Sequence, residues 1–231
     1  MAGVAPLAYR LRLVRQNTAL FHWSADDGDV LTSRSGQVGT YSRASGDSVV
    51  TATGTPNVGY GQPRWLDTPY GAAALILPAS SAPDNWTFPC AFLLRPLSIY
   101  VAGYLRQGGS GSGSTRILRL GDGSANTVDL ISALPGNGTT ALYTDGSGNP
   151  TAVLSSANPA SGDYVEYLVQ IDGTEKLTLT RTINLGTPQV SSLSASGAAF
   201  AGGFHGAVLS IAGGSSAAAF AYRHILIMAD S

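Results

Sequence analysis

The chain has 231 residues, of which 44% are hydrophobic, and its 13 basic and 14 acidic side chains leave a formal net charge of −1 at neutral pH. The hydrophobic content excludes a disordered chain, and 29 glycines without a three-residue period exclude a collagen-like one. The near-zero charge predicts no nucleic-acid partner, and no apolar run reaches the roughly 20 residues of a membrane-spanning helix, so no membrane insertion is expected.

A chain of this length can bury a core without disulfides or a bound metal. Its single cysteine, Cys90, has no intrachain partner and is expected to pack as a small hydrophobic residue. The first residues lack a basic start followed by a long apolar core, so we expect no signal peptide and synthesis in a cytoplasm.

The N-terminal segment alternates apolar and charged residues from 9 to 13, which is the period of a half-buried strand. Arg10 and Arg12 form the charged face, which either faces solvent or docks onto an acidic neighbouring subunit. A second strand is expected at 18–24. The Asp-rich turn at 26–29 lacks the ligand spacing of an EF-hand calcium loop.

Four short extended segments are expected next. The run 41–43 ends in a Ser-Gly-Asp turn, and the β-branched run 48–53 is stopped by glycine and proline. Pro63 holds the segment 62–65 extended, because proline fixes its own φ and restricts the residue before it. The apolar run 73–77 is short enough to be a buried strand.

The order of these segments resembles a module of bacteriophage virion proteins that precedes or enters a laminin-G/concanavalin-like jelly roll. The resemblance spans residues 33–80, and it departs from the family at Leu77, after which an acidic residue and a polar run usually follow. It implies a structural or adhesive virion role, in capsid decoration or in a tail or fibre, rather than a reaction. The matching positions are Thr40, Tyr41, Arg43, Ala44, Ser45, Val50, Thr51, Asn57, Pro63, Arg64 and Leu75.

Residues 79–85 are typical of a linker or crossing loop, so we expect an N-terminal β extension at 1–80 and a β-sandwich at 81–231. After this loop, many short strands are separated by Gly, Pro, Asn and Asp, which predicts an all-β antiparallel β-sandwich or a barrel. The eleven expected strands lie near residues 87–95, 98–106, 116–121, 127–132, 139–144, 151–155, 164–171, 175–183, 188–194, 205–211 and 219–228.

The clearest strand is 164–171, because every odd-numbered residue from 165 is apolar while Glu166 and Gln170 fall on the opposite face. It is followed by Asp-Gly, the strongest short hairpin signal. The last strand, 220–228, is apolar on both faces and is expected in the middle of a sheet. From residue 86 onward this pattern resembles the laminin-G/concanavalin-like jelly roll.

Catalysis is not expected. Glycoside hydrolysis requires two carboxyl groups across the scissile bond, but Glu166 and Glu175 are the only glutamates and neither has an acidic partner two residues away. Asp122, Asp145 and Asp172 lie in Asp-Gly turns, no Gly-x-Ser-x-Gly motif occurs, and the three histidines lack metal-ligand spacing. We therefore predict no catalytic residue, no metal and no cofactor.

The expected function is that of a non-enzymatic virion structural protein that acts through assembly surfaces, forms a homo-oligomer and contacts capsid or tail subunits. Residues 1–80 are expected to make much of the intersubunit contact or to wrap the sandwich. The alternative is a carbohydrate-binding module for host surface glycans, in which aromatic side chains stack on sugar rings. The residues expected at an interface or glycan site are Arg10, Arg12, Tyr41, Arg43, Arg64, Trp65, Trp86, Tyr104 and Tyr143.

Overall fold

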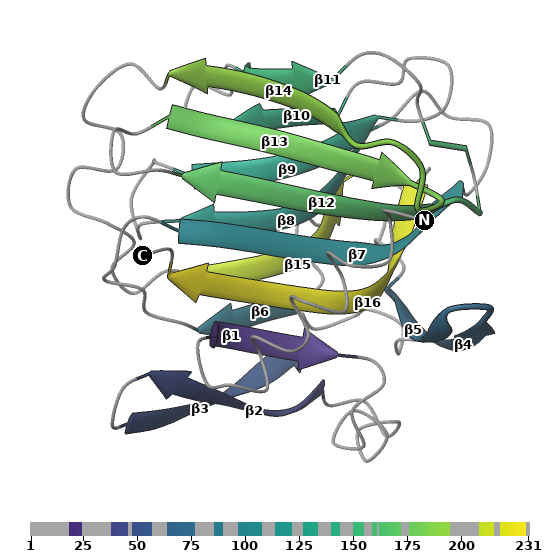
Figure 1. The fold of residues 1–231 in the computed structure, drawn as a ribbon. Coiled ribbons are helices and arrows are strands. Elements are labelled where there is room, and N and C mark those ends of the chain that lie inside the picture. The colour runs from purple at the N-terminus through teal and green to yellow at the C-terminus, as the bar shows by residue number, and fades with distance from the viewer. Residues whose placement is uncertain are drawn as a thin grey trace.

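The structure of the protein is a computed structural model, in which sixteen strands form two stacked layers (Figure 1). It describes residues 19–24, 38–45, 48–56, 64–76, 86–89, 97–107, 114–121, 127–133, 140–143, 150–154, 159–160, 162–171, 176–194, 208–214 and 218–229.

The first sheet has eight strands in the order β14-β13-β12-β7-β16-β5-β4, and β1 also pairs with β16. All of its pairings are antiparallel. Its strands are β1 (Ala19–Ser24), β4 (Arg64–Thr68), β5 (Gly71–Ile76), β7 (Leu97–Gln107), β12 (Tyr164–Ile171), β13 (Lys176–Ile183), β14 (Gln189–Ser194) and β16 (Ala218–Ala229).

The second sheet also has eight strands, in the order β11-β10-β9-β8-β15-β6-β3-β2, and is antiparallel throughout. Its strands are β2 (Val38–Ser45), β3 (Ser48–Pro56), β6 (Trp86–Pro89), β8 (Ser114–Gly121), β9 (Thr127–Ala133), β10 (Thr140–Tyr143), β11 (Pro150–Leu154) and β15 (Val208–Gly214).

These sheets confirm the predicted all-β antiparallel β-sandwich. The expected hairpin is formed by β12 and β13, and the last strand, β16, lies inside its sheet between β7 and β5. Of the expected strand near 205–211 the structure describes β15, which runs from Val208 to Gly214. Of the expected strand 87–95 it describes β6, which ends at Pro89. The strand expected at 9–13, with Arg10 and Arg12, lies outside the described residues.

Strands from the predicted N-terminal extension take part in both sheets. Strands β1 and β5 both pair with β16, and β3 pairs with β6. The division of the chain at residue 80 stays a prediction, but these strands are hydrogen-bonded into the same layers as the later ones.

The core lies between the two sheets. Along β12, Val165, Tyr167 and Val169 are fully buried, whereas the intervening Glu166 is only half-buried, which confirms the alternation expected from the sequence. The hydroxyl group of Tyr222 on β16 donates a hydrogen bond to the backbone carbonyl of Ile117 on β8, so one contact joins the two layers directly.

The face of the first sheet that is turned towards the second sheet, called the inner face, includes the buried charged residue Arg181. Arg181 on β13 lies opposite Tyr167, and its Nε and Nη2 both donate to Gln189 Oε1, at 3.2 and 2.6 Å. Burial lowers the pKa of the Arg181 guanidinium, an effect that the nearby Tyr167 opposes. The other face of this sheet, called the outer face below, carries the candidate site.

Candidate functional site

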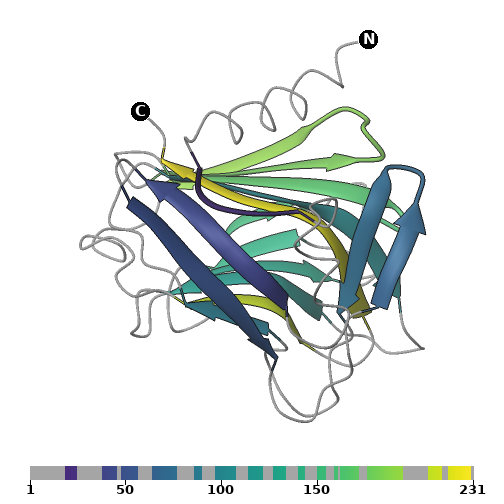
Figure 2. The ribbon, with the colours of Figure 1, turned by 90° about the horizontal axis from the view of Figure 1, so that it is seen from below.

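The candidate site begins at the turn between β4 and β5, whose hairpin stands at one end of the sandwich (Figure 2). Its tip holds Pro69 and Tyr70, and Gly71 adopts a φ of 112°, a conformation that side-chain-bearing residues rarely accept. The Thr68 hydroxyl donates to the Gly71 carbonyl and accepts the Tyr70 amide at 3.3 Å. These contacts fix the turn that presents Tyr70.

Three tyrosines meet beside this turn on the outer face. The ring centroids of Tyr70 and Tyr164 are 4.8 Å apart, those of Tyr104 and Tyr164 are 5.3 Å apart, and all three pairs are tilted. Tyr104 and Tyr164 are directly opposite each other on β7 and β12. Both are buried, at 7% and 1% exposed, whereas Tyr70 is 38% exposed. We call Tyr70, Tyr104 and Tyr164 the tyrosine patch.

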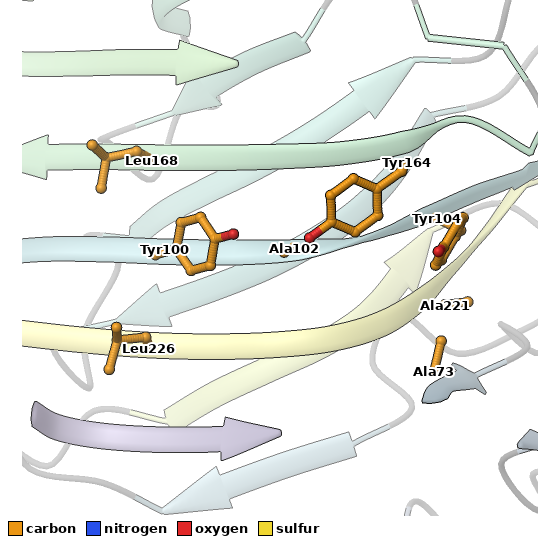
Figure 3. Close-up of a cluster of buried hydrophobic side chains, with 8 residues drawn as sticks. All are labelled: Ala73, Tyr100, Ala102, Tyr104, Tyr164, Leu168, Ala221 and Leu226. Atoms are coloured by element: carbon orange, nitrogen blue, oxygen red, sulfur yellow. The ribbon is translucent and has the colours of Figure 1, made fainter. Parts of the chain in front are cut away.

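The patch lies at one end of a larger cluster on the outer face. Leu168, Tyr100 and Leu226 form one row across β12, β7 and β16. Tyr164, Tyr104 and Ala221 form a second row across the same strands, and Ala102 lies between the two rows (Figure 3). All eight members of the cluster are buried. They are Ala73, Tyr100, Ala102, Tyr104, Tyr164, Leu168, Ala221 and Leu226.

A tight turn after β13 forms the second side of the patch. Asn184 and Leu185 both have positive φ, 48° and 58°, and the Gly186 amide closes the turn onto the Ile183 carbonyl at 2.8 Å. Positive φ is costly for a residue as bulky as leucine, so packing must hold it in place. Leu185 packs against the buried cluster that contains Tyr104 and Tyr164.

Hydrogen bonds tie this turn to β12. The Asn184 amide donates to the Tyr164 carbonyl at 2.8 Å, and Asn184 Oδ1 accepts the Tyr164 amide at 2.9 Å. Asn184 Nδ2 donates to Asp163 Oδ1 at 2.8 Å, and Asp163 Oδ2 accepts the Ala160 amide at 2.7 Å. Asn184 is exposed and Asp163 half-buried, so both present polar atoms at the edge of the patch with lone pairs or an N–H still open to a ligand.

The neighbouring hydroxyl groups are kept protonated. The Tyr100 hydroxyl donates to Glu166 Oε1 at 2.8 Å, and the pKa of Tyr100 is raised well above its usual range by burial and then by Tyr164 and Glu166. Burial and Glu166 also raise the pKa of Tyr164, partly opposed by Arg223. Both tyrosines therefore remain neutral hydrogen-bond donors at physiological pH.

The Tyr164 hydroxyl differs from its neighbours in its hydrogen bonding. It is shielded from solvent and makes no hydrogen bond of normal geometry in the structure. Burial and Glu166 raise its pKa, whereas Arg223 and Tyr100 lie within hydrogen-bonding reach of it and lower its pKa. By contrast, the Tyr104 hydroxyl donates to Thr68 Oγ1 at 2.7 Å.

Of the residues predicted from the sequence, Tyr104 belongs to the patch, as a buried rather than an exposed ring. The side chains of the others lie outside the described part of the chain, and Arg10 and Arg12 lie outside it entirely. Their strands are known. Arg64 and Trp65 lie on β4, Tyr41 and Arg43 on β2, Trp86 on β6 and Tyr143 on β10.

Sequence reasoning missed Tyr70, Tyr164, Asp163, Asn184 and Leu185 as site residues. A signal was present for Tyr70, because an aromatic residue between proline and glycine in a turn is forced towards the surface. Asn184 lies at a strand end and is a residue type that tolerates positive φ, but nothing in the sequence indicates that it meets Tyr164.

Metal binding finds no support in the described residues, where no three His, Cys, Asp or Glu side chains gather at one place. No helix that is both long and apolar enough to cross a membrane occurs in the same part of the chain.

No protein-family model matches the chain, and no curated protein sequence matches it. Among solved structures, 93 chains are similar in fold. The carbohydrate recognition domain of Emp46p has a TM-score of 0.55 at 10% identity, with 94% of this chain and 98% of that one covered. Domain 4 of AbnA, an extracellular GH43 arabinanase from Geobacillus stearothermophilus solved with arabinotriose, has a TM-score of 0.55 at 15% identity and covers 92% of each chain.

A third similar structure is the enzymatically active domain of tailspike protein 2 from bacteriophage CBA120, with a TM-score of 0.50 at 17% identity. The match covers 74% of this chain but only 28% of the tailspike chain. At these identities the similarity concerns the fold. The chain therefore shares its antiparallel β-sandwich fold with the Emp46p carbohydrate recognition domain and with domain 4 of AbnA.

Proposed function

We propose that the protein is a non-enzymatic carbohydrate-binding module and that the tyrosine patch is its binding site. The observation that carries the proposal is Tyr70, a large aromatic ring 38% exposed at a hairpin tip and supported from behind by Tyr164 at 4.8 Å. A ring held in this way offers a rigid apolar surface for the C–H face of a sugar, at low cost in conformational entropy.

Polar groups beside the ring are suited to sugar hydroxyls. Asn184 and Asp163 lie at the edge of the patch and are already oriented by hydrogen bonds to each other and to the backbone. Preformed sites of this type combine an aromatic surface with a few fixed polar groups, which give orientation and specificity. The similarity to the Emp46p carbohydrate recognition domain and to the arabinotriose-bound AbnA domain supports the proposal at the level of the fold.

The test is a glycan microarray probed with the wild type, Tyr70→Ala and Tyr70→Phe. We expect the wild type to bind a defined set of glycans and Tyr70→Ala to lose at least about 30-fold in affinity, the loss typical of an aromatic hot spot of about 2 kcal/mol. Tyr70→Phe keeps the ring and should retain binding. A wild-type protein that binds no glycan, or a Tyr70→Ala variant that binds like the wild type, would contradict the proposal.

A second candidate function, favoured by the phage-like pattern of residues 33–80 and by the tailspike neighbour, is that of a virion structural component. In that setting the protein would be a homo-oligomer bound to capsid or tail subunits and would present its glycan site to the host surface. Light scattering of the purified protein, with and without phage particles, distinguishes the two. Co-sedimentation with particles supports the virion role. A monomer that binds glycans but does not associate with particles supports only the carbohydrate-binding proposal.

A further inference from the structure

The outer face continues beyond the tyrosine patch along β13. Because directly opposite residues of an antiparallel pair share a face, Thr182 lies beside Glu166 and Thr180 beside Leu168 on the face that carries Tyr164. Thr178 follows two residues away on the same face. We call Thr178, Thr180 and Thr182 the threonine lane.

The lane is partly open to solvent, whereas Leu168 on the adjacent strand β12 is buried. All three threonines are half-buried, and on the adjacent strand β14 Val190 is 60% exposed and Ser192 is exposed. The threonine nearest the far end, Thr178, shares a hydrogen bond with Ser192 at 3.1 Å. At a rise of about 3.4 Å per residue the lane is about 13 Å long.

The lane leads into the patch without interruption. β13 ends at Ile183, and the next two residues are Asn184 and Leu185, which form the edge of the patch. The hydroxyl of Tyr164 points along the outer face towards Ala102 (Figure 3), which shares a row with Glu166 and Thr182. This buried hydroxyl therefore lies at the junction of the lane and the patch.

The geometry points to an extended, neutral glycan of several units as the ligand, lying along β13 with one unit stacked on Tyr70. Threonine presents a methyl group and a hydroxyl group together, which matches the mixed apolar and hydroxyl surface of a sugar chain. The half-buried carboxylates Asp163 and Glu166 lie near the patch end and disfavour an acidic chain. The half-buried Arg223 also acts on the Tyr164 hydroxyl, and together with these two carboxylates the charges described at the patch end sum to −1.

This inference rests on the proposed function but predicts something the patch alone does not: affinity that rises with ligand length. The experiment is calorimetric titration with a series of neutral oligosaccharides of increasing length, together with chains of the same length that contain uronic acid or sulfate. We expect affinity to rise until the ligand reaches the end of the lane, and to be weaker for the acidic chains.

The variant that tests the lane is Thr178→Val with Thr180→Val, which keeps the side-chain shape and the strand propensity but removes two hydroxyl groups. Each lost hydrogen bond should lower the affinity of the longest ligand about fivefold, while the shortest ligand that stacks on Tyr70 should bind as before. The matched control is Ser191→Ala, which removes a hydroxyl on the same sheet at a position paired with the core residue Leu179.

The possible failures can be told apart. Suppose that Tyr70→Ala abolishes binding, but affinity changes neither with ligand length nor in the threonine variant. The glycan then binds at the tyrosine patch and does not contact the threonine lane. If only acidic chains bind, the inference of a neutral ligand is wrong, whereas if no oligosaccharide of either kind binds at any length, the proposed function itself fails. Melting temperatures measured in parallel show that each variant is folded.

Discussion

At the scale of single residues, the site depends on how Tyr70, Tyr104 and Tyr164 are supported. Tyr70 is exposed because a turn lifts it off the sheet, and it keeps one orientation because Tyr164 stacks behind it at 4.8 Å. Tyr104 is anchored in turn by the hydrogen bond to Thr68 in the hairpin. The exposed ring of Tyr70 therefore belongs to a cluster of three tyrosines, of which Tyr104 and Tyr164 are buried.

Gly103 is a second residue-scale determinant, because β7 and β16 approach each other closely at this point. A Cβ atom at position 103 would lie 2.1 Å from the Ala221 carbonyl oxygen and 2.6 Å from Phe220 Cε1. Gly103→Ala should therefore force the two strands apart and lower the free energy of unfolding by about 3 kcal/mol, which corresponds to a fall in melting temperature of about 6–12 °C.

The matched control for this prediction is Gly162→Ala. Gly162 is exposed and has a φ of 96°, but nothing lies within 4 Å of the added Cβ atom, so only backbone strain of about 1 kcal/mol is expected. Thermal unfolding by circular dichroism compares the two. Equal melting temperatures for Gly103→Ala and the wild type would show that the strands are not in close contact there.

At the scale of elements, the β4–β5 hairpin contributes the exposed ring of Tyr70 to the candidate site on the first sheet. It lies at the edge of the first sheet, beyond β16, and its tip reaches Tyr104 and Tyr164 on β7 and β12. The Thr68 hydroxyl makes three contacts that hold this arrangement, to the Gly71 carbonyl, the Tyr70 amide and the Tyr104 hydroxyl.

Replacing Thr68 by valine should therefore act on both stability and binding. Thr68→Val leaves the buried Tyr104 hydroxyl without this acceptor, which costs about 2 kcal/mol, and loosens the turn that presents Tyr70. Thr68→Ser keeps the hydroxyl and should behave like the wild type. Urea denaturation and glycan titration of both variants check the prediction, and a Thr68→Val protein as stable as Thr68→Ser would refute it.

The sequence predicts the elements of this fold well and the site poorly. The strand 164–171 and its hairpin follow from the alternation of residues such as Val165 and Glu166 and from an Asp-Gly turn, all of which are local. The order of the strands is not local: β7 pairs with β12 and β16, far apart in the sequence. Because the site joins Tyr70, Tyr104, Tyr164 and Asn184 from separate elements, only the pairing of the strands brings it together.

At the scale of the whole molecule, buried ionisable groups make stability depend on pH. Tyr100 and Tyr164 have raised pKa values in the folded protein, chiefly because they are buried, whereas an exposed tyrosine ionises near its usual value of 10.0. Above that pH the unfolded chain binds fewer protons than the folded one. The contribution of these tyrosines to the free energy of unfolding is therefore fully present below pH 10.0 and falls as the pH rises beyond it.

The corresponding measurement is the urea midpoint at pH values from about 9 to about 11, which spans the ordinary ionisation of tyrosine. We expect a steady loss of stability in the wild type and a flatter profile in the double variant Tyr100→Phe with Tyr164→Phe, whatever its stability at neutral pH. Identical slopes for the two proteins would mean that these hydroxyl groups are not responsible.

The molecule as a whole combines an antiparallel β-sandwich with a candidate site at the end of its first sheet, where we propose that a glycan binds. Hydrogen–deuterium exchange with and without the best glycan from the array tests this location most directly. The account predicts slower exchange at residues 68–71, 163–164 and 184–186, where the hairpin, β12 and the Asn184 turn meet. Protection confined to other strands, or no change on adding a glycan that binds, would contradict it.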